Sequence, residues 1–191
     1  MASHRRSLYV PKTDLPARAK PQEDYFMANV LFKGNPAHTV GELPRVGSAA
    51  PAVSLVNRTL EDVTLDAFAG KKKILNIVPS LDTGTCATST RKFNEKVGSR
   101  QDAVVLIVSK DLPFAQKRFC EAEGVANVVS LSAFRSTFDE DWGVQLIDTP
   151  LKGLLARAVV VLDENNKVIY TELVPEITTE PDYDKAMAAL G

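Results

Sequence analysis

Apolar runs of strand length alternate with segments of helix length through the middle of this chain. The apolar runs occupy residues 74–78, 103–109 and 128–131, and the segments 86–97 and 113–123 between them are expected to be helices. Strands that alternate with helices are typical of α/β proteins, in which helices cover a central sheet. The pattern therefore predicts an α/β fold.

The segments at both ends of the chain complete this plan. Further elements are expected, in chain order, as short strands or hairpins near 30–32, 39–40 and 53–55, a helix over about 133–142, strands at 157–162 and 168–173 joined by a turn, and a helix over 182–190. Strand–helix alternation followed by a hairpin and a last helix is a thioredoxin-like plan, here with an N-terminal β addition.

The composition suits one globular domain and excludes several classes of protein. The chain has 191 residues, of which 45% are apolar, and a net charge of −1. No basic stripe is present, so nucleic acid is not an expected partner. No apolar run approaches the roughly 18 residues of a membrane-spanning helix, so no membrane is expected either. The two histidines, His4 and His38, form no ligand-like cluster, and we expect no metal and no bound cofactor.

The first 26 residues differ from the rest of the chain. They combine three prolines with mixed charges and lack the apolar stretch of a secretory signal. We expect a disordered extension over 1–26, upstream of a natural start at Met27, and one domain over 27–191. A genuine extension is the alternative. Two cysteines without a secretory signal favour a cytoplasmic location, where a disulfide is usually transient and catalytic.

Cys86 lies where the apolar strand at 74–78 passes into the following helix. A cysteine at a helix N-terminus faces the positive end of the helix dipole and unpaired backbone N–H groups. Both favour the thiolate, which is the nucleophilic form of the side chain. The sequence therefore predicts a reactive cysteine at this position.

Thr83 and Pro79 make the motif around this cysteine more specific, because the three residues have the spacing Pro-x3-Thr-x2-Cys. A threonine three residues before the cysteine can place its hydroxyl beside the sulfur, and the proline fixes the turn and has no N–H. The run resembles the peroxidatic motif of the peroxiredoxins. The alternative is a small buried cysteine in a strand-to-helix turn, since free cysteine is among the most buried residues.

Cys120 is the second cysteine, 34 positions after Cys86, which is neither a Cys-x-x-Cys nor a metal-ligand spacing. A peroxide oxidises a thiolate to a sulfenic acid. A second thiol in the chain can then condense with the sulfenic acid to form a disulfide. The resemblance thus implies a peroxidatic Cys86 and a resolving Cys120. The alternative for Cys120 is a core cysteine on the apolar face of its helix, and both interpretations hold if that helix must shift before the disulfide forms.

Four stretches narrow the resemblance to the thiol peroxidase group of the atypical two-cysteine peroxiredoxins. They are 80–86 (SLDTGTC), 112–120 (LPFAQKRFC), 150–163 (PLKGLLARAVVVLD) and 176–183 (EITTEPDY). The likeness extends from about Phe32 to Leu190 and implies a peroxiredoxin fold. One departure is Thr85, where the family usually has an apolar residue.

The same resemblance implies that Arg157 completes the site by stabilising the Cys86 thiolate and orienting the peroxide. The alternative is a solvated arginine at a strand end. Arg91, on the Cys86 helix, is a second cationic candidate. Arg91 lies five residues after Cys86 and therefore on a different face of the helix, so we expect it to form a structural ion pair.

The implied activity is reduction of hydrogen peroxide and alkyl hydroperoxides, with the disulfide recycled by thioredoxin in a homodimeric enzyme. The alternative function is a thiol–disulfide redox sensor without significant turnover, which would use the same cysteines. A thioredoxin-like disulfide oxidoreductase is disfavoured because the chain lacks Cys-x-x-Cys.

Overall fold

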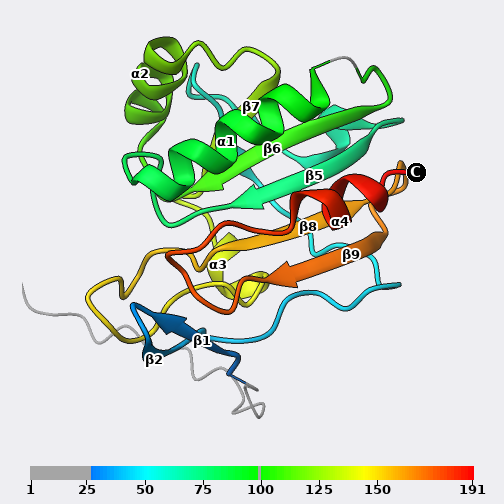
Figure 1. Cartoon of the computed structure of the whole chain (residues 1–191). Helices are drawn as coiled ribbons and strands as arrows, with labels where there is room; N and C mark the ends of the chain where they lie inside the picture. The colour runs from blue at the N-terminus through cyan, green and yellow to red at the C-terminus, as the bar shows by residue number, and fades with distance from the viewer. Residues whose placement is uncertain (1–26, 99) are drawn as a thin grey trace, which may run out of the picture.

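A seven-stranded sheet organises the part of the chain that the computed structural model describes, residues 27–98 and 100–191 (Figure 1). The expected extension over 1–26 lies outside these residues. The strand order is β4-β3-β7-β6-β5-β8-β9, with β5, β6 and β7 parallel and the other pairs antiparallel. The strands are β3 (Leu55–Val56), β4 (Asp62–Val63), β5 (Lys72–Ile77), β6 (Ala103–Ser109), β7 (Val128–Ser132), β8 (Ala158–Leu162) and β9 (Val168–Leu173).

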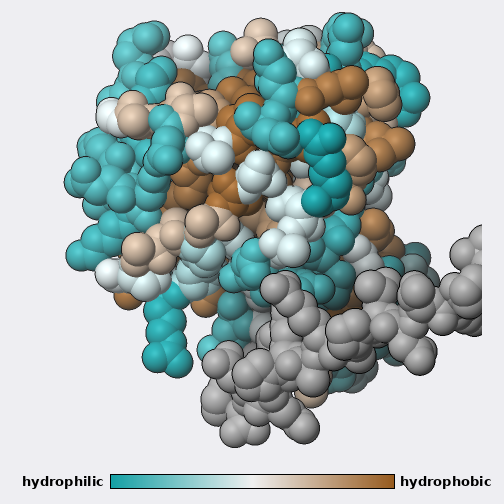
Figure 2. Space-filling view, turned by 180° about the vertical axis from the view of Figure 1, so that it is seen from behind, coloured by the Kyte–Doolittle hydropathy of each residue, from teal (hydrophilic) through white to brown (hydrophobic). Residues whose placement is uncertain are grey.

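Helices cover the two faces of this sheet unequally. The helices are α1 (Gly84–Val97), α2 (Pro113–Glu123), α3 (Phe138–Asp141) and α4 (Tyr183–Ala188), with a 3₁₀ turn at Leu65–Phe68. Helices α1, α2 and α4 contribute to one core cluster, and α3 contributes to the other. Figure 1 shows α1 and α4 in front of the sheet, and Figure 2 shows the opposite side, where apolar residues reach the surface between hydrophilic ones.

Strand periodicity divides the core between the two faces. In β6, Val105 and Ile107 face the cluster under α1, whereas Leu106 and Val108 face the cluster on the α3 side. All four side chains are fully buried. A strand that is buried on both faces has apolar residues at consecutive positions, which is why apolar and polar residues do not alternate in β6.

Local signals set the ends of the two helices that carry cysteines. Helix α1 begins after Thr83, whose backbone is extended (φ −101°, ψ 144°). Helix α2 begins with Pro113, a residue whose fixed φ and missing N–H suit the first helical position. It ends at Gly124 in the left-handed conformation (φ 63°), which glycine adopts without steric cost.

An antiparallel hairpin of β1 (Asn29–Phe32) and β2 (Asn35–His38) precedes the sheet. Its two turn residues, Lys33 and Gly34, both have positive φ angles of 53° and 77°, as a two-residue hairpin turn requires. The hairpin is fixed to the segment after β9, because Ile177 N donates to Leu31 O at 2.8 Å. This contact brings Phe32 beside the candidate site.

Two expected elements were placed wrongly. The helix expected over 133–142 is only the single turn Phe138–Asp141. The hydroxyls of Ser132 and Ser136 accept hydrogen bonds from Phe134 N and Phe138 N, and such local side-chain bonds compete with helix formation. The strand expected at 39–40 is also displaced, since β2 ends at His38.

Among the described residues, no helix is both long enough and apolar enough to cross a membrane.

Candidate active site

Cys86 is the third residue of α1, close after the end of β5, and its side chain is fully buried. Two side chains contact its sulfur. The hydroxyl of Thr83 lies 2.8 Å from Sγ, and Nη2 of Arg157 lies 3.3 Å from it. The structure therefore brings together three of the five residues expected at the site, and Pro79 lines the pocket beside them.

Thr83 is the N-cap of α1, but its side chain makes no capping hydrogen bond. Its Oγ1 lies instead between Cys86 Sγ at 2.8 Å and Ser80 O at 3.2 Å. A hydroxyl has one proton and two lone pairs, so it can accept from a thiol while it donates to Ser80 O, or donate to a thiolate. This geometry suits either protonation state of Cys86.

Arg157, immediately before β8, is only 1% exposed, so the alternative of a solvated strand-end arginine is wrong. Its Nε donates to Ile177 O at 2.8 Å, which fixes the plane of the guanidinium. Its Nη1 has no partner among the described residues. A buried charged donor without an acceptor is costly, so this nitrogen marks a place where an oxygen of a ligand would be stabilised.

A pocket of about 260 Å³ lies at this site. Thr83 and Arg157 supply polar groups, and Phe32, Leu151 and Leu154 supply apolar walls. The lining residues are Phe32, Pro79, Ser80, Thr83, Gly84, Thr85, Leu151, Leu154, Arg157, Ile177 and Thr178. A small polar group with an apolar substituent matches this lining.

Cys120 lies in the last turn of α2, is 4% exposed and belongs to the same core cluster as Cys86. Both cysteines are free thiols in the structure. Cys120 is thus a core cysteine, which was one of the two interpretations of its position in the sequence. A disulfide with Cys86 stays a prediction, and it requires the α carbons to come within about 7 Å.

Comparison with known proteins identifies the family of this chain. A family model described as Redoxin matches residues 45–187. The chain belongs to the redoxin family. It is 59% identical to a thiol peroxidase of Corynebacterium glutamicum over 165 residues, which are 86% of this chain and 100% of that protein. A thiol peroxidase of Mycobacterium tuberculosis is 56% identical over 86% of this chain and 99% of its own length.

Solved structures place this redoxin among the peroxiredoxins. A peroxiredoxin-like protein from Aquifex aeolicus aligns with a TM-score of 0.81 and 44% identity, over 86% of this chain and 96% of that chain. The expected thioredoxin-like peroxiredoxin fold is confirmed, and the small hairpin β1–β2 is added to it.

Glu176 precedes two pocket-lining residues, Ile177 and Thr178, and the sequence indicated no role for it. Its carboxylate accepts hydrogen bonds from Lys33 N at 3.1 Å and Gly34 N at 2.9 Å in the hairpin turn. It also accepts from the hydroxyl and N–H of Thr178, at 2.7 and 2.9 Å. The Thr178 hydroxyl, followed by these backbone donors, lowers the pKa of Glu176 to about 2. Glu176 thereby joins the hairpin to the segment whose Ile177 O holds Arg157.

Thr85 and Arg91 have structural contacts on α1. Thr85, the departure from the family pattern, donates to Thr178 O at 3.1 Å and lines the pocket. Arg91 pairs with Glu123 of α2 at 2.5 Å, which confirms the expected ion pair. Arg157 is therefore the cation at the Cys86 sulfur, and Arg91 joins two helices.

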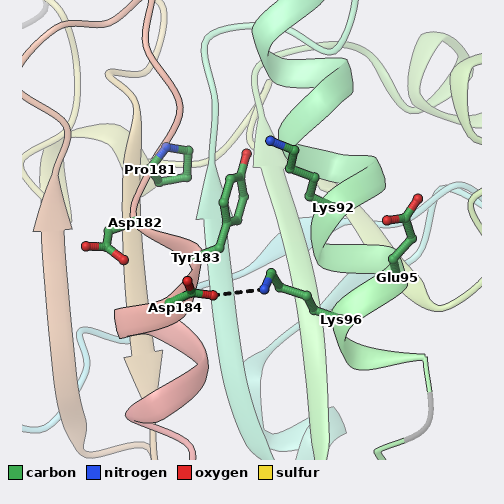
Figure 3. A pocket seen from close by; sticks show the side chains of 7 residues that line it. All are labelled: Lys92, Glu95, Lys96, Pro181, Asp182, Tyr183 and Asp184. Carbon is green, nitrogen blue, oxygen red and sulfur yellow. Dashed lines mark hydrogen bonds and ion pairs between the residues drawn. The ribbon is translucent and has the colours of Figure 1, made fainter.

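A second pocket, of about 510 Å³, lies between α1 and the start of α4 (Figure 3). Lys92 and Lys96 enter it from α1 and pair with Glu180 at 2.7 Å and Asp184 at 2.9 Å. Tyr183 lies between them, and burial followed by its bond to Glu180 raises the pKa of its hydroxyl. The two lysines here are already paired, so these ion pairs join α1 to the segment that begins α4.

Within the described residues, no group of three His, Cys, Asp or Glu side chains is arranged to hold a metal ion.

Proposed function

We propose that this chain is a thiol peroxidase that reduces hydrogen peroxide and organic hydroperoxides with Cys86 as the peroxidatic residue. The observation that carries the proposal is the contact of one buried sulfur with the Thr83 hydroxyl and the Arg157 guanidinium at a pocket. The redoxin family match and the thiol peroxidases at 56–59% identity support it. The apolar walls of the pocket fit the organic part of a hydroperoxide.

In the first step, the Cys86 thiolate attacks the terminal oxygen of the peroxide. An S–O bond forms, the O–O bond breaks, and water or an alcohol leaves after protonation. Negative charge moves from sulfur to the departing oxygen, so donors preorganised around both atoms lower the barrier. Arg157 Nη2 contacts the sulfur, and Nη1 has no partner in the part of the chain that the structure describes, so the guanidinium can stabilise charge on the sulfur and on the departing oxygen at once.

In the second step, the Cys120 thiol attacks the sulfur of the Cys86 sulfenic acid, an S–S bond forms and water leaves. A thioredoxin-type dithiol then reduces the disulfide by thiol–disulfide exchange and regenerates both thiols.

Pro79, at the pocket wall, keeps a backbone without an N–H beside the peroxide. A homodimer and a cytoplasmic location belong to the same proposal and rest on the resemblance and on cysteine usage.

The test is peroxide-dependent oxidation of NADPH through thioredoxin reductase and thioredoxin, with wild type compared with Cys86→Ser. Many turnovers per wild-type chain and none in the variant are expected. A redox sensor would oxidise once and stop, so a single turnover in wild type would favour that alternative. Substantial turnover in Cys86→Ser would remove Cys86 from the mechanism.

A further inference from the structure

Asp111 links the two segments of the chain that carry the cysteines. Its carboxylate accepts hydrogen bonds from Ser80 Oγ and Leu81 N, both at 2.7 Å, in the loop that leads to Cys86. It also accepts from Ser109 Oγ at 2.8 Å. Its own backbone lies two residues before Pro113, where α2 begins. The Asp111 side chain thus fixes the loop that leads to Cys86, and its backbone lies just before α2, the helix that carries Cys120.

On the Cys86 side, the contact continues to the reacting sulfur. The carbonyl of Ser80, whose hydroxyl is bonded to Asp111, accepts from Thr83 N and Thr83 Oγ1, each at 3.2 Å. Thr83 Oγ1 lies 2.8 Å from Cys86 Sγ. The position of Ser80 therefore sets the position of the hydroxyl that contacts the sulfur.

On the Cys120 side, the contact continues into α2. Ser109 Oγ, bonded to Asp111, accepts from Gln116 Nε2 at 3.0 Å. Gln116 is fully buried, also donates to Leu131 O at 3.1 Å, and lies four residues before Cys120 on the same face of the helix. The polar contacts thus run without a break from the Cys86 sulfur to α2.

Two ion pairs also connect these segments, Arg91–Glu123 between α1 and α2 and a more exposed pair at the loop before Cys86. Asp82, in the loop before Cys86, lies 3.7 Å from Arg118 of α2. Their side chains are 65% and 72% exposed, and exposed ion pairs contribute little to stability. Asp111 is half-buried and has three donors, so it supplies the stronger connection.

The second half of α1 is held independently of Asp111. Lys96 pairs with Asp184 in the first turn of α4 (Figure 3), and Lys92 pairs with Glu180 just before α4. The Phe93 and Tyr183 rings pack edge to face with centroids 5.1 Å apart. Loss of the Asp111 contacts would therefore loosen the loop that leads to Cys86, while the second half of α1 stays in place.

We propose that Asp111 is a positioning residue that holds the 79–86 loop in its peroxide-reactive conformation and must release it before Cys120 reaches Cys86. Weakening these contacts slows sulfenic acid formation and speeds disulfide formation. The inference rests on the proposed function, because both steps belong to that reaction.

The test compares Asp111→Asn with Asp82→Asn in single-turnover reactions followed by quenching and mass spectrometry. Asparagine has nearly the same shape but one acceptor oxygen, so it cannot keep all three bonds. Since bonds to a charged group are the stronger ones, sulfenic acid formation in Asp111→Asn should slow about ten-fold or more. Disulfide formation should become several-fold faster, while Asp82→Asn should change both rates by less than about two-fold.

A merely structural role would not move the two rates in opposite directions. Unchanged or slower disulfide formation in Asp111→Asn, or unchanged sulfenic acid formation, overturns the inference. If Asp111→Asn does not fold, Ser80→Ala breaks the same contact from the other side and is judged by the same criteria. Absence of any wild-type reaction at Cys86 refutes the proposed function instead, so the two failures are distinguishable.

Discussion

Replacement of Arg157 by alanine tests the electrostatics of the site most directly. The change removes the guanidinium group at 3.3 Å from Cys86 Sγ, together with the unpartnered Nη1. It also leaves Ile177 O without the Nε donor that now lies 2.8 Å away. One substitution therefore affects both the reacting sulfur and the stability of the fold.

The catalytic effect should be the larger of the two. Loss of one preorganised donor slows catalysis about a hundred- to a thousand-fold, or roughly 3–4 kcal/mol in the barrier. Leaving the Ile177 carbonyl unpaired costs about 1–3 kcal/mol of stability. Removal of an incompletely paired buried charge offsets part of this cost. Since domains are stable by about 5–15 kcal/mol, Arg157→Ala should fold and react slowly.

The assay is the rate of Cys86 oxidation by hydrogen peroxide in a Cys120→Ser background, where no disulfide can follow. A sulfenic acid trap and mass spectrometry record the product, and thermal unfolding records the fold. Arg91→Ala is the matched control, because Arg91 lies on α1 but pairs with Glu123 and not with the sulfur. Its rate should stay within about two-fold of the background, as expected for a partly exposed pair.

The reasoning fails if folded Arg157→Ala oxidises within two-fold of the background, or if Arg91→Ala slows as much. The first result would show that the sulfur needs no guanidinium. The second would show that any loss of positive charge near α1 has the same effect. Arg157→Lys separates charge from geometry, because one ammonium cannot reproduce the planar fork that serves Ile177 O and Sγ together.

Further tests use other residues and other measurements. Thr83→Val should slow the same oxidation step by on the order of a hundred-fold, whereas Thr83→Ser keeps the hydroxyl and should remain close to wild type in stopped-flow measurements. Because the pKa of Glu176 is lowered to about 2 from 4.5, its carboxylate stabilises the fold above pH 4.5, and this stabilisation is lost as pH falls toward 2. Glu176→Gln should flatten that dependence of the urea midpoint, and an unchanged pH profile would contradict it. Cys120→Ser should consume one peroxide and then stall as a sulfenic or sulfinic acid, whereas wild type should show a Cys86–Cys120 disulfide by non-reducing mass spectrometry. Light scattering should give a dimer mass at micromolar concentration.

Features with local causes could be predicted from the sequence. Helix α2 has the expected bounds because Pro113 and Gly124 act within their own turns. Thr83 and Cys86 are three residues apart, so their contact follows from the start of one helix. The error over 133–142 also has a local cause, because serine hydroxyls bonded to the nearby backbone replace the first part of the expected helix, which begins only at Phe138.

Features that depend on distant partners could not be predicted in this way. Asp111 lies two residues before Pro113, as an ordinary turn residue can, and its role appears only when Ser80 is brought beside it. Glu176 accepts from Lys33 and Gly34, more than 140 positions away in the chain. The contact of Arg157 with Cys86 spans 71 positions and was expected from resemblance to a family, not from any pattern in the residues.

The arrangement around α1 explains how a fully buried cysteine can take part in two successive reactions. Hydrogen bonds hold the first turn of α1. Ser89 Oγ donates to Cys86 O at 3.0 Å, and Asn76 Nδ2, on β5, donates to Ser89 Oγ at 3.2 Å. Net contributions of about 0.5–1.5 kcal/mol per bond make its release cost only a few kcal/mol. The loop-closure entropy of a disulfide acts on the unfolded state, so the driving force here is the condensation of the Cys86 sulfenic acid with the Cys120 thiol, which forms the S–S bond and releases water. Bond formation can therefore offset the unwinding of that turn, while the ion pairs from Lys92 and Lys96 keep the second half of α1 in place for refolding once the disulfide is reduced.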